Sequence, residues 1–102
     1  MTDFTEKVFD AVIKIPSGKV TTYGQIALIC GHKGAARAVG STLHKNPAFG
    51  IIPCHRVVNS KGELAEEFVF GGKSVQKKLL LEENIEFSDE YKVNMRRHFW
   101  FG

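Results

Sequence analysis

Residues 22–44, with the sequence TYGQIALICGHKGAARAVGSTLH, predict two short helices joined by a tight turn. The motif Thr22-x-x-Gln25 is typical of a capped helix start, and this helix is expected to run to about Cys30. Gly31 suits the left-handed position that commonly follows a helix. A second helix should run from residue 34 or 35 to about His44. This pattern indicates a helix-turn-helix motif, whose second helix approaches a DNA duplex with residues near its N-terminus.

The rest of the chain alternates between helical patterns and short apolar segments, so we predict a mainly α fold with short β elements and a winged or simple helix-turn-helix architecture. The tail from Ile85 is aromatic and basic, and we assign no element to it. The other expected elements are a helix between Phe4 and Ile15, an extended stretch at Lys19–Thr21, a loop at 46–50, apolar strands or core segments at Ile51–Ile52 and Val57–Val58, a turn at 59–62, and a helix capped by Ser74 that ends near Asn84.

The composition is that of one ordinary globular domain covering residues 1–102, with 43% apolar and 25% charged residues. The net charge is +3, and no acidic residue lies between Asp10 and Glu63, so that half of the chain is cationic and suits phosphates. We expect no membrane span or signal peptide and therefore a cytoplasmic protein, in which Cys30 and Cys54 remain reduced thiols.

The segment Pro53-Cys54-His55-Arg56-Val57 contains a candidate nucleophile. A nearby imidazolium or guanidinium lowers the pKa of a cysteine and raises its thiolate fraction. His55 would reach Cys54 through a bridging water or a tight turn, which Pro53 could supply. The alternative is that Cys54 is simply a buried apolar residue, because free cysteine is among the most buried residue types.

The Pro53–Val57 segment resembles the active-site signature of the O6-alkylguanine-DNA alkyltransferase family. Further motifs in the family's order are Val20–Gly24, Ala35–Gly40, Asn46-Pro47 and Gly71-Gly72. The resemblance implies the C-terminal DNA-binding domain of that family. It also implies direct transfer of an alkyl group from guanine O6 to Cys54, with no cofactor and one turnover.

The resemblance also assigns roles to individual residues. Arg37 would fill the gap left by a flipped base, and Tyr23 would rotate the 3′ phosphate and contact the base. Base flipping of this kind gives an enzyme access to atoms inside a duplex. His55 would take the thiol proton through water, and Glu83 would orient His55. Asn46 would tie its loop to the active-site turn, although an ordinary helix C-cap is an equal alternative.

The remaining DNA or lesion contacts implied by the resemblance are Thr22, Ala36, Gly40, Ser41, Lys45, Val57 and Phe70, with the small residues of the second helix allowing approach to the minor groove. Arg56 is interpreted as structural. The pair Cys30-x-His32 has no second pair at ligand spacing, so we expect no metal, and Cys30 is interpreted as a core residue.

The chain departs from the family where Val69 and Phe70 replace the usual tyrosine and small residue before the double glycine. This change and the short chain leave a second hypothesis open. The protein would then be an alkyltransferase-like sensor that binds O6-alkylguanine duplex DNA as a monomer and hands it to nucleotide excision repair proteins. The retained Cys54 favours transfer. An ordinary helix-turn-helix transcription factor is a third and weaker hypothesis.

Overall fold

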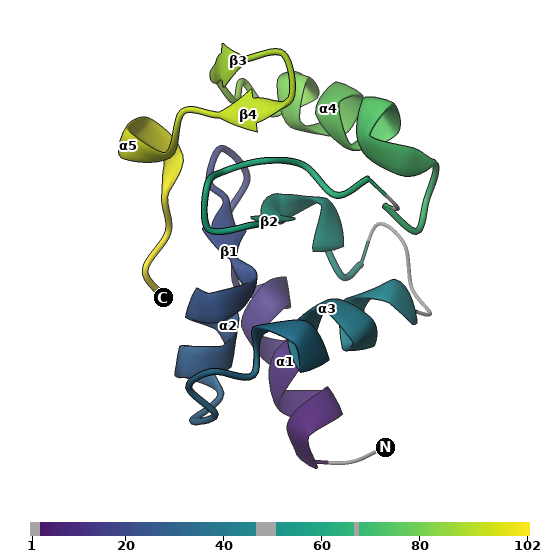
Figure 1. Ribbon diagram of the computed structural model, residues 1–102, viewed down its shortest axis with the longest axis vertical. Helices are drawn as coiled ribbons and strands as arrows, with labels where there is room; N and C mark the ends of the chain where they lie inside the picture. Colours follow the sequence, from purple (N-terminus) through teal and green to yellow (C-terminus); the bar gives the residue numbers. More distant parts are fainter. Residues whose placement is uncertain (1–2, 47–50, 67) are drawn as a thin grey trace.

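The computed structural model describes residues 3–46, 51–66 and 68–102, so most of the loop expected at 46–50 lies outside the described residues. Its helices and strands divide into two ends of the molecule, with a small parallel strand pair between them (Figure 1). The elements are α1 (Asp3–Ile13), β1 (Thr21–Thr22), α2 (Tyr23–Ile29), α3 (Ala36–His44), a 3₁₀ turn η1 (Cys54–Arg56), β2 (Val57–Val58), α4 (Gly72–Glu82), β3 (Phe87–Asp89), β4 (Lys92–Val93) and α5 (Met95–His98).

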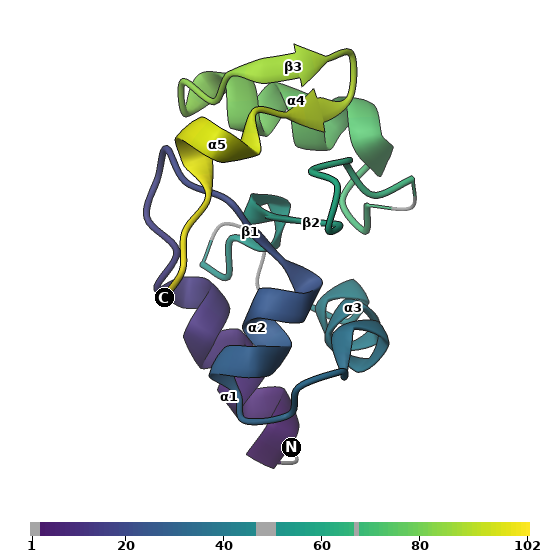
Figure 2. The same ribbon diagram turned by 60° about the vertical axis from the view of Figure 1, so that its left-hand side comes forward.

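Helices α1, α2 and α3 pack against one another at one end of the molecule (Figures 1 and 2). The Thr22 side chain accepts a hydrogen bond from the Gln25 N–H at 3.1 Å and caps α2 as expected. Gly31 has a φ of +80°, and the following His32 N–H donates to the Ala27 carbonyl at 2.9 Å. These bonds make the tight turn before α3, and the expected helix-turn-helix motif is confirmed.

The strand pair β1–β2 links the helix-turn-helix motif to the segment that contains Cys54. The strands are parallel, with Thr21 opposite Val57 and Thr22 opposite Val58. The C-terminal tail lies beside the residue before β1, because the Trp100 N–H donates to the Val20 carbonyl at 2.8 Å. Thr22 belongs both to this strand pair and to the start of α2, so β2 and η1 are held close to the helix-turn-helix motif.

Helix α4, the hairpin β3–β4 and α5 form the other end of the molecule, away from α1–α3 in both views (Figures 1 and 2). Their core contains six buried residues: Val20, Val58, Leu64, Leu80, Ile85 and Val93. We assigned no element to this tail from the sequence. No described helix is long and apolar enough to cross a membrane.

Two local expectations were wrong in part. Ile51–Ile52 forms no strand: Ile52 is buried in the core as one alternative expected, whereas Ile51 is 71% exposed. Helix α4 begins at Gly72 with Gly71 as its N-cap, so Ser74 lies inside the first turn and does not cap it. Gly71 has a φ of +126°, and an added Cβ would lie 2.7 Å from Val75 Cγ2, so glycine is required there.

Candidate active site and DNA-binding surface

Cys54 begins the 3₁₀ turn η1, directly after Pro53. The Cys54 N–H donates to the Ile52 carbonyl at 2.8 Å, and the Arg56 N–H donates to the Pro53 carbonyl at 3.0 Å. Parallel strand β2 follows the turn at once and holds its far end against β1. Cys54 is consequently fixed in position and only 6% exposed.

Cys54 lines a pocket of about 170 Å³ between α3 and the segment that precedes α4. This volume is below the range of roughly 300–1,000 Å³ for ordinary ligand pockets, so it suits one heterocycle better than a whole nucleoside. Gly40 contributes no side chain, and a Cβ added there would be 3.9 Å from the Tyr23 ring. The lining consists of Tyr23, Gly40, Leu43, His44, Cys54, Ala65, Phe68 and Val69.

The surroundings of Cys54 favour the protonated thiol over the thiolate. Burial raises its pKa, against smaller lowering effects of hydrogen bonds from the Asn46 side chain and the backbone. The expectation that neighbouring cations would lower the pKa of Cys54 was therefore wrong, because desolvation disfavours the thiolate more strongly. The Tyr23 pKa is also raised, first by burial and second by the nearby Cys54.

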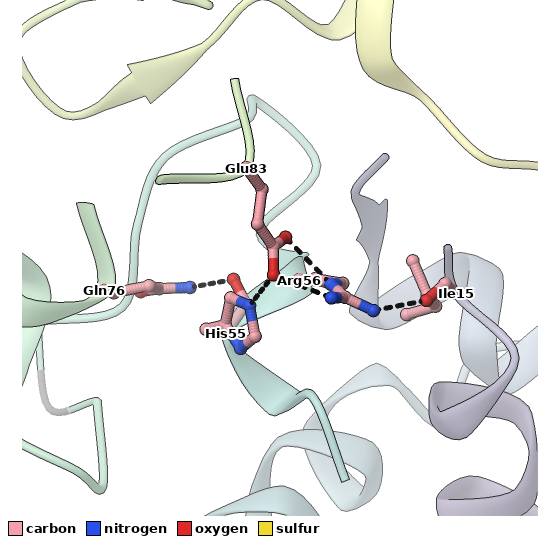
Figure 3. Close-up of polar contacts among 5 residues, drawn as sticks. All are labelled: Ile15, His55, Arg56, Gln76 and Glu83. Atoms are coloured by element: carbon pink, nitrogen blue, oxygen red, sulfur yellow. Dashed lines mark hydrogen bonds and ion pairs between the residues drawn. The ribbon is translucent and has the colours of Figure 1, made fainter. Parts of the chain in front are cut away.

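His55, Arg56 and Glu83 form a mostly buried cluster (Figure 3). His55 Nε2 lies 2.9 Å from Glu83 Oε2, so the expected pairing of these two residues is confirmed. Arg56 donates to both carboxylate oxygens of Glu83, at 2.9 and 2.6 Å. Its third hydrogen bond goes to the Ile15 carbonyl at 2.7 Å, which fits the structural role expected for Arg56.

The electrostatics of this cluster favour a neutral imidazole and an ionised carboxylate. Burial lowers the pKa of His55 and outweighs the hydrogen bond and charge of Glu83, which act in the opposite direction. The Glu83 pKa is lowered because hydrogen bonds from Arg56 and His55 overcome its desolvation. A neutral His55 is the form that can accept a proton.

Asn46 follows α3 and ties it to the active-site turn. Its Nδ2 donates to the Ile52 carbonyl at 2.9 Å, and Ile52 is the residue whose carbonyl also accepts from the Cys54 N–H. Asn46 is buried, and its side chain also hydrogen-bonds Cys54. The expected tie between this loop and the turn is present.

The residues expected to contact DNA are divided between the α3 surface and the interior. Arg37, Ser41 and Lys45 are exposed, whereas Ala36 and Gly40 are partly buried on the same helix. The Thr22 hydroxyl oxygen is used by the helix cap. Two other candidates are absent from the described lining of the pocket: Val57 is 1% exposed in the core, and Phe70 packs edge-to-face on Phe68 with ring centroids 5.9 Å apart.

Four pocket residues were not predicted from the sequence. Leu43 and His44 follow Gly40 by three and four positions, so helical spacing from Gly40 would have indicated them. Ala65 and Phe68 lie in an irregular segment, where no periodic signal places a side chain. Among the described residues, no group of three histidine, cysteine or acidic side chains could hold a metal ion.

Comparison with known proteins identifies the family. Residues 3–85 match the family model described as 6-O-methylguanine DNA methyltransferase, DNA binding domain. The chain belongs to this family. The resemblance inferred from the Pro53–Val57 signature and the fold class are thereby confirmed.

Individual relatives fall into two groups. The chain is 41% identical over 105 residues to alkyltransferase-like protein 1 of Schizosaccharomyces pombe, covering 98% of this chain and 96% of the relative. It is 44% identical over 81 residues to the methylated-DNA–protein-cysteine methyltransferase of Mycobacterium tuberculosis, covering 79% of this chain but 47% of the relative. This chain thus spans about half the length of that methyltransferase.

A solved structure shows the same fold bound to DNA. The crystal structure of S. pombe Atl1 with damaged DNA containing O6-carboxymethylguanine superimposes with a TM-score of 0.87 and 38% identity, covering 98% of this chain and 96% of that chain.

Proposed function

We propose that this protein binds duplex DNA through α3, takes a flipped O6-alkylguanine into the pocket and accepts the alkyl group on Cys54. The observation that carries the proposal is the position of Cys54 in a pocket that also includes Tyr23 and three residues of α3. A base rotated out of the stack beside α3 would enter this pocket. Arg37, exposed near the start of α3, would fill the gap in the duplex.

The transfer is a single displacement at carbon. The Cys54 sulfur forms a bond to the alkyl carbon while the carbon–O6 bond breaks, and the electron pair of that bond stays on the guanine. The thiol proton passes through water to His55. The departing guanine anion takes up one proton from solvent, and His55 releases its proton to solvent, so charge and atoms balance. Because burial raises the pKa of Cys54 and disfavours the thiolate, removal of the thiol proton is part of the transfer. Neutral His55, oriented by Glu83, is suited to receive the proton.

The comparisons support recognition of alkylated guanine. The S. pombe relative was crystallised with damaged DNA containing O6-carboxymethylguanine, and the M. tuberculosis relative is named as a methylated-DNA–protein-cysteine methyltransferase. Within the family we propose that this chain acts as a monomer on DNA in the cytoplasm. It needs no cofactor, because the displacement uses only the thiol and the alkylated base.

A second candidate function is lesion sensing without transfer. It is favoured by the burial that raises the pKa of Cys54 and by the near full-length similarity to alkyltransferase-like protein 1. In that case the pocket would hold the alkylated base, and nucleotide excision repair proteins would act on the marked site. Both functions need the same surface of α3, so DNA affinity alone does not separate them.

The deciding experiment is intact-protein mass after incubation with a duplex containing one O6-methylguanine, with a gel shift on the same sample. Transfer predicts a gain of one methyl group, mapped to Cys54, which Cys54→Ala abolishes while lesion binding remains. Cys30→Ala is the matched control, because Cys30 is equally buried and lies outside the pocket lining. An unchanged mass with a lesion-specific shift would favour the sensor. Absence of both signals would refute the proposal.

Arg37→Ala tests the flipping assignment. We expect lesion affinity to fall about tenfold or more, since unstacking a base costs a few kcal/mol and the vacated space would stay empty. Arg96→Ala is a control of equal charge, because Arg96 is exposed on α5 at the other end of the molecule (Figure 2). Equal losses for the two variants would mean that only net charge matters.

A further inference from the structure

Gln76 has no exposed surface although its side chain is polar. It lies in the middle of α4, four residues before the equally buried Leu80, where the helical pattern predicts an apolar residue. A buried amide is tolerated only when its hydrogen-bonding groups are satisfied. The structure shows what satisfies it.

All of the bonding partners of the Gln76 carboxamide are backbone groups of the active site. Its Oε1 accepts from the Ala65 N–H at 2.9 Å, and its Nε2 donates to the carbonyls of His55 at 3.0 Å and Val57 at 3.2 Å (Figure 3 shows the bond to His55). An N–H only donates and a carbonyl only accepts, so these partners determine the orientation of the amide.

These three bonds connect two segments that line the pocket. The His55 carbonyl belongs to the turn η1 that contains Cys54, and Ala65 belongs, with Phe68 and Val69, to the pocket wall formed by the segment that precedes α4. We propose that Gln76 is a positioning residue that sets the separation between Cys54 and this wall, and hence which alkyl groups fit beside the sulfur. The effect on DNA rests on the function proposed above, whereas the effect on Cys54 itself does not.

Two substitutions at Gln76 separate hydrogen bonding from side-chain volume. Gln76→Met keeps the length of the side chain and removes every hydrogen bond. Gln76→Glu keeps one donor and one acceptor while the carboxyl group is protonated, but once ionised it offers only acceptors to the two carbonyls. The variant should therefore resemble the wild type in acid and Gln76→Met in alkali. Exposed Lys78, on the same helix, provides the control variant Lys78→Ala.

The first readout is the rate at which iodoacetamide alkylates Cys54, compared by peptide mass with the rate at Cys30 in the same molecules. Both thiols are 6% exposed, so unfolding or general loosening would accelerate both, whereas a displaced pocket wall accelerates Cys54 alone. We expect the Cys54-to-Cys30 ratio to rise about tenfold in Gln76→Met, because loss of the three hydrogen bonds makes local opening of this wall easier and exposes the Cys54 thiol more often. In Gln76→Glu the ratio should rise between about pH 5 and pH 8, where a buried carboxyl group titrates.

The second readout is the relative affinity for duplexes with O6-methylguanine and O6-benzylguanine, which should shift toward the larger group in Gln76→Met. Folded Gln76→Met with the wild-type thiol ratio would overturn the inference. So would a Gln76→Glu ratio that matched the wild type at every pH. If Gln76→Met does not fold, Gln76→Glu in acid supplies the folded variant. Failure of the wild type to bind lesions would refute the proposed function but leave the thiol test intact.

Discussion

Arg56→Ala should destabilise the protein far more than removal of an exposed arginine. Arg56 donates two hydrogen bonds to Glu83, at 2.9 and 2.6 Å, and one to the Ile15 carbonyl, at 2.7 Å. The side chains of Arg56 and Glu83 are both only 16% exposed. Among the described residues, the substitution would leave Glu83 with His55 as its remaining hydrogen-bond partner, and it would remove the link between η1 and Ile15, which follows α1.

The size of the effect follows from the burial of the pair. Removing one partner of a buried ion pair costs about 3–5 kcal/mol, and we expect about 3 kcal/mol here because the pair is not fully enclosed. In a domain of this size, about 3 kcal/mol lowers the melting temperature by roughly 12–24 °C. The control is Arg97→Ala, which breaks a 3.1 Å pair with Glu86 whose side chains are 67% and 55% exposed. Such surface pairs contribute about 0–1 kcal/mol.

Urea unfolding at neutral pH, followed by circular dichroism, measures both variants on the same scale. We expect Arg56→Ala to lose at least about 2 kcal/mol more unfolding free energy than Arg97→Ala. If the two losses were equal within about 0.5 kcal/mol, the hydrogen bonds of Arg56 would contribute no more to stability than an exposed ion pair does.

Three further predictions concern the residues around the pocket. Asn46→Ala removes the hydrogen bond to the Ile52 carbonyl, so it should lower the free energy of unfolding in urea by about 1–3 kcal/mol. It also removes a hydrogen bond that lowers the pKa of Cys54, so this pKa should rise further, as measured by thiolate absorbance. Gly40→Ala should leave the fold intact or stabilise it by about 0.5–1 kcal/mol, since the added Cβ meets the Tyr23 ring at 3.9 Å, yet weaken lesion binding by narrowing the pocket; unchanged binding in a gel shift would contradict this role. The lowered pKa of His55 means that the unfolded chain binds its proton more readily, so stability from neutral His55 is present above pH 6.5 and is lost as pH falls through the lowered folded value. Glu83 adds a further loss of stability at lower pH, because its pKa is also lowered in the folded state. Thermal unfolding of the wild type and of His55→Gln as the pH falls from neutral should show the loss due to His55 in the wild type alone.

Much of the helical half could be predicted because its signals are local. The Thr22 cap, Gly31 and the apolar spacing of α2 and α3 depend on residues within one or two turns of each other, and each prediction matched the structure. Helix α4 was predicted to start from Ser74, but Gly71 occupies the cap, because its φ of +126° and the nearby Val75 side chain both exclude a residue with a Cβ. The hairpin β3–β4 was missed because its short strands pair with a register irregularity and show little alternation.

The candidate site shows the same division. Cys54, His55 and Glu83 could be named from the family resemblance, and the hydrogen bond between His55 and Glu83 joins residues 28 positions apart. The pKa of Cys54 was predicted in the wrong direction, because the sequence displays neighbouring cations but not the degree of burial. Gln76 had no signal at all, since its three partners are backbone groups that any sequence could provide.

The sequence by itself determined the helix-turn-helix motif, the family and the candidate nucleophile, because these depend on short runs of side chains with characteristic spacing. Only the tertiary structure decided the pocket, the direction of the pKa shift of Cys54 and the bonding of Gln76. Desolvation and hydrogen bonding to backbone depend on which segments fold against each other, and β1 with β2, Asn46 with Ile52, and α4 with η1 are brought together by the packed core.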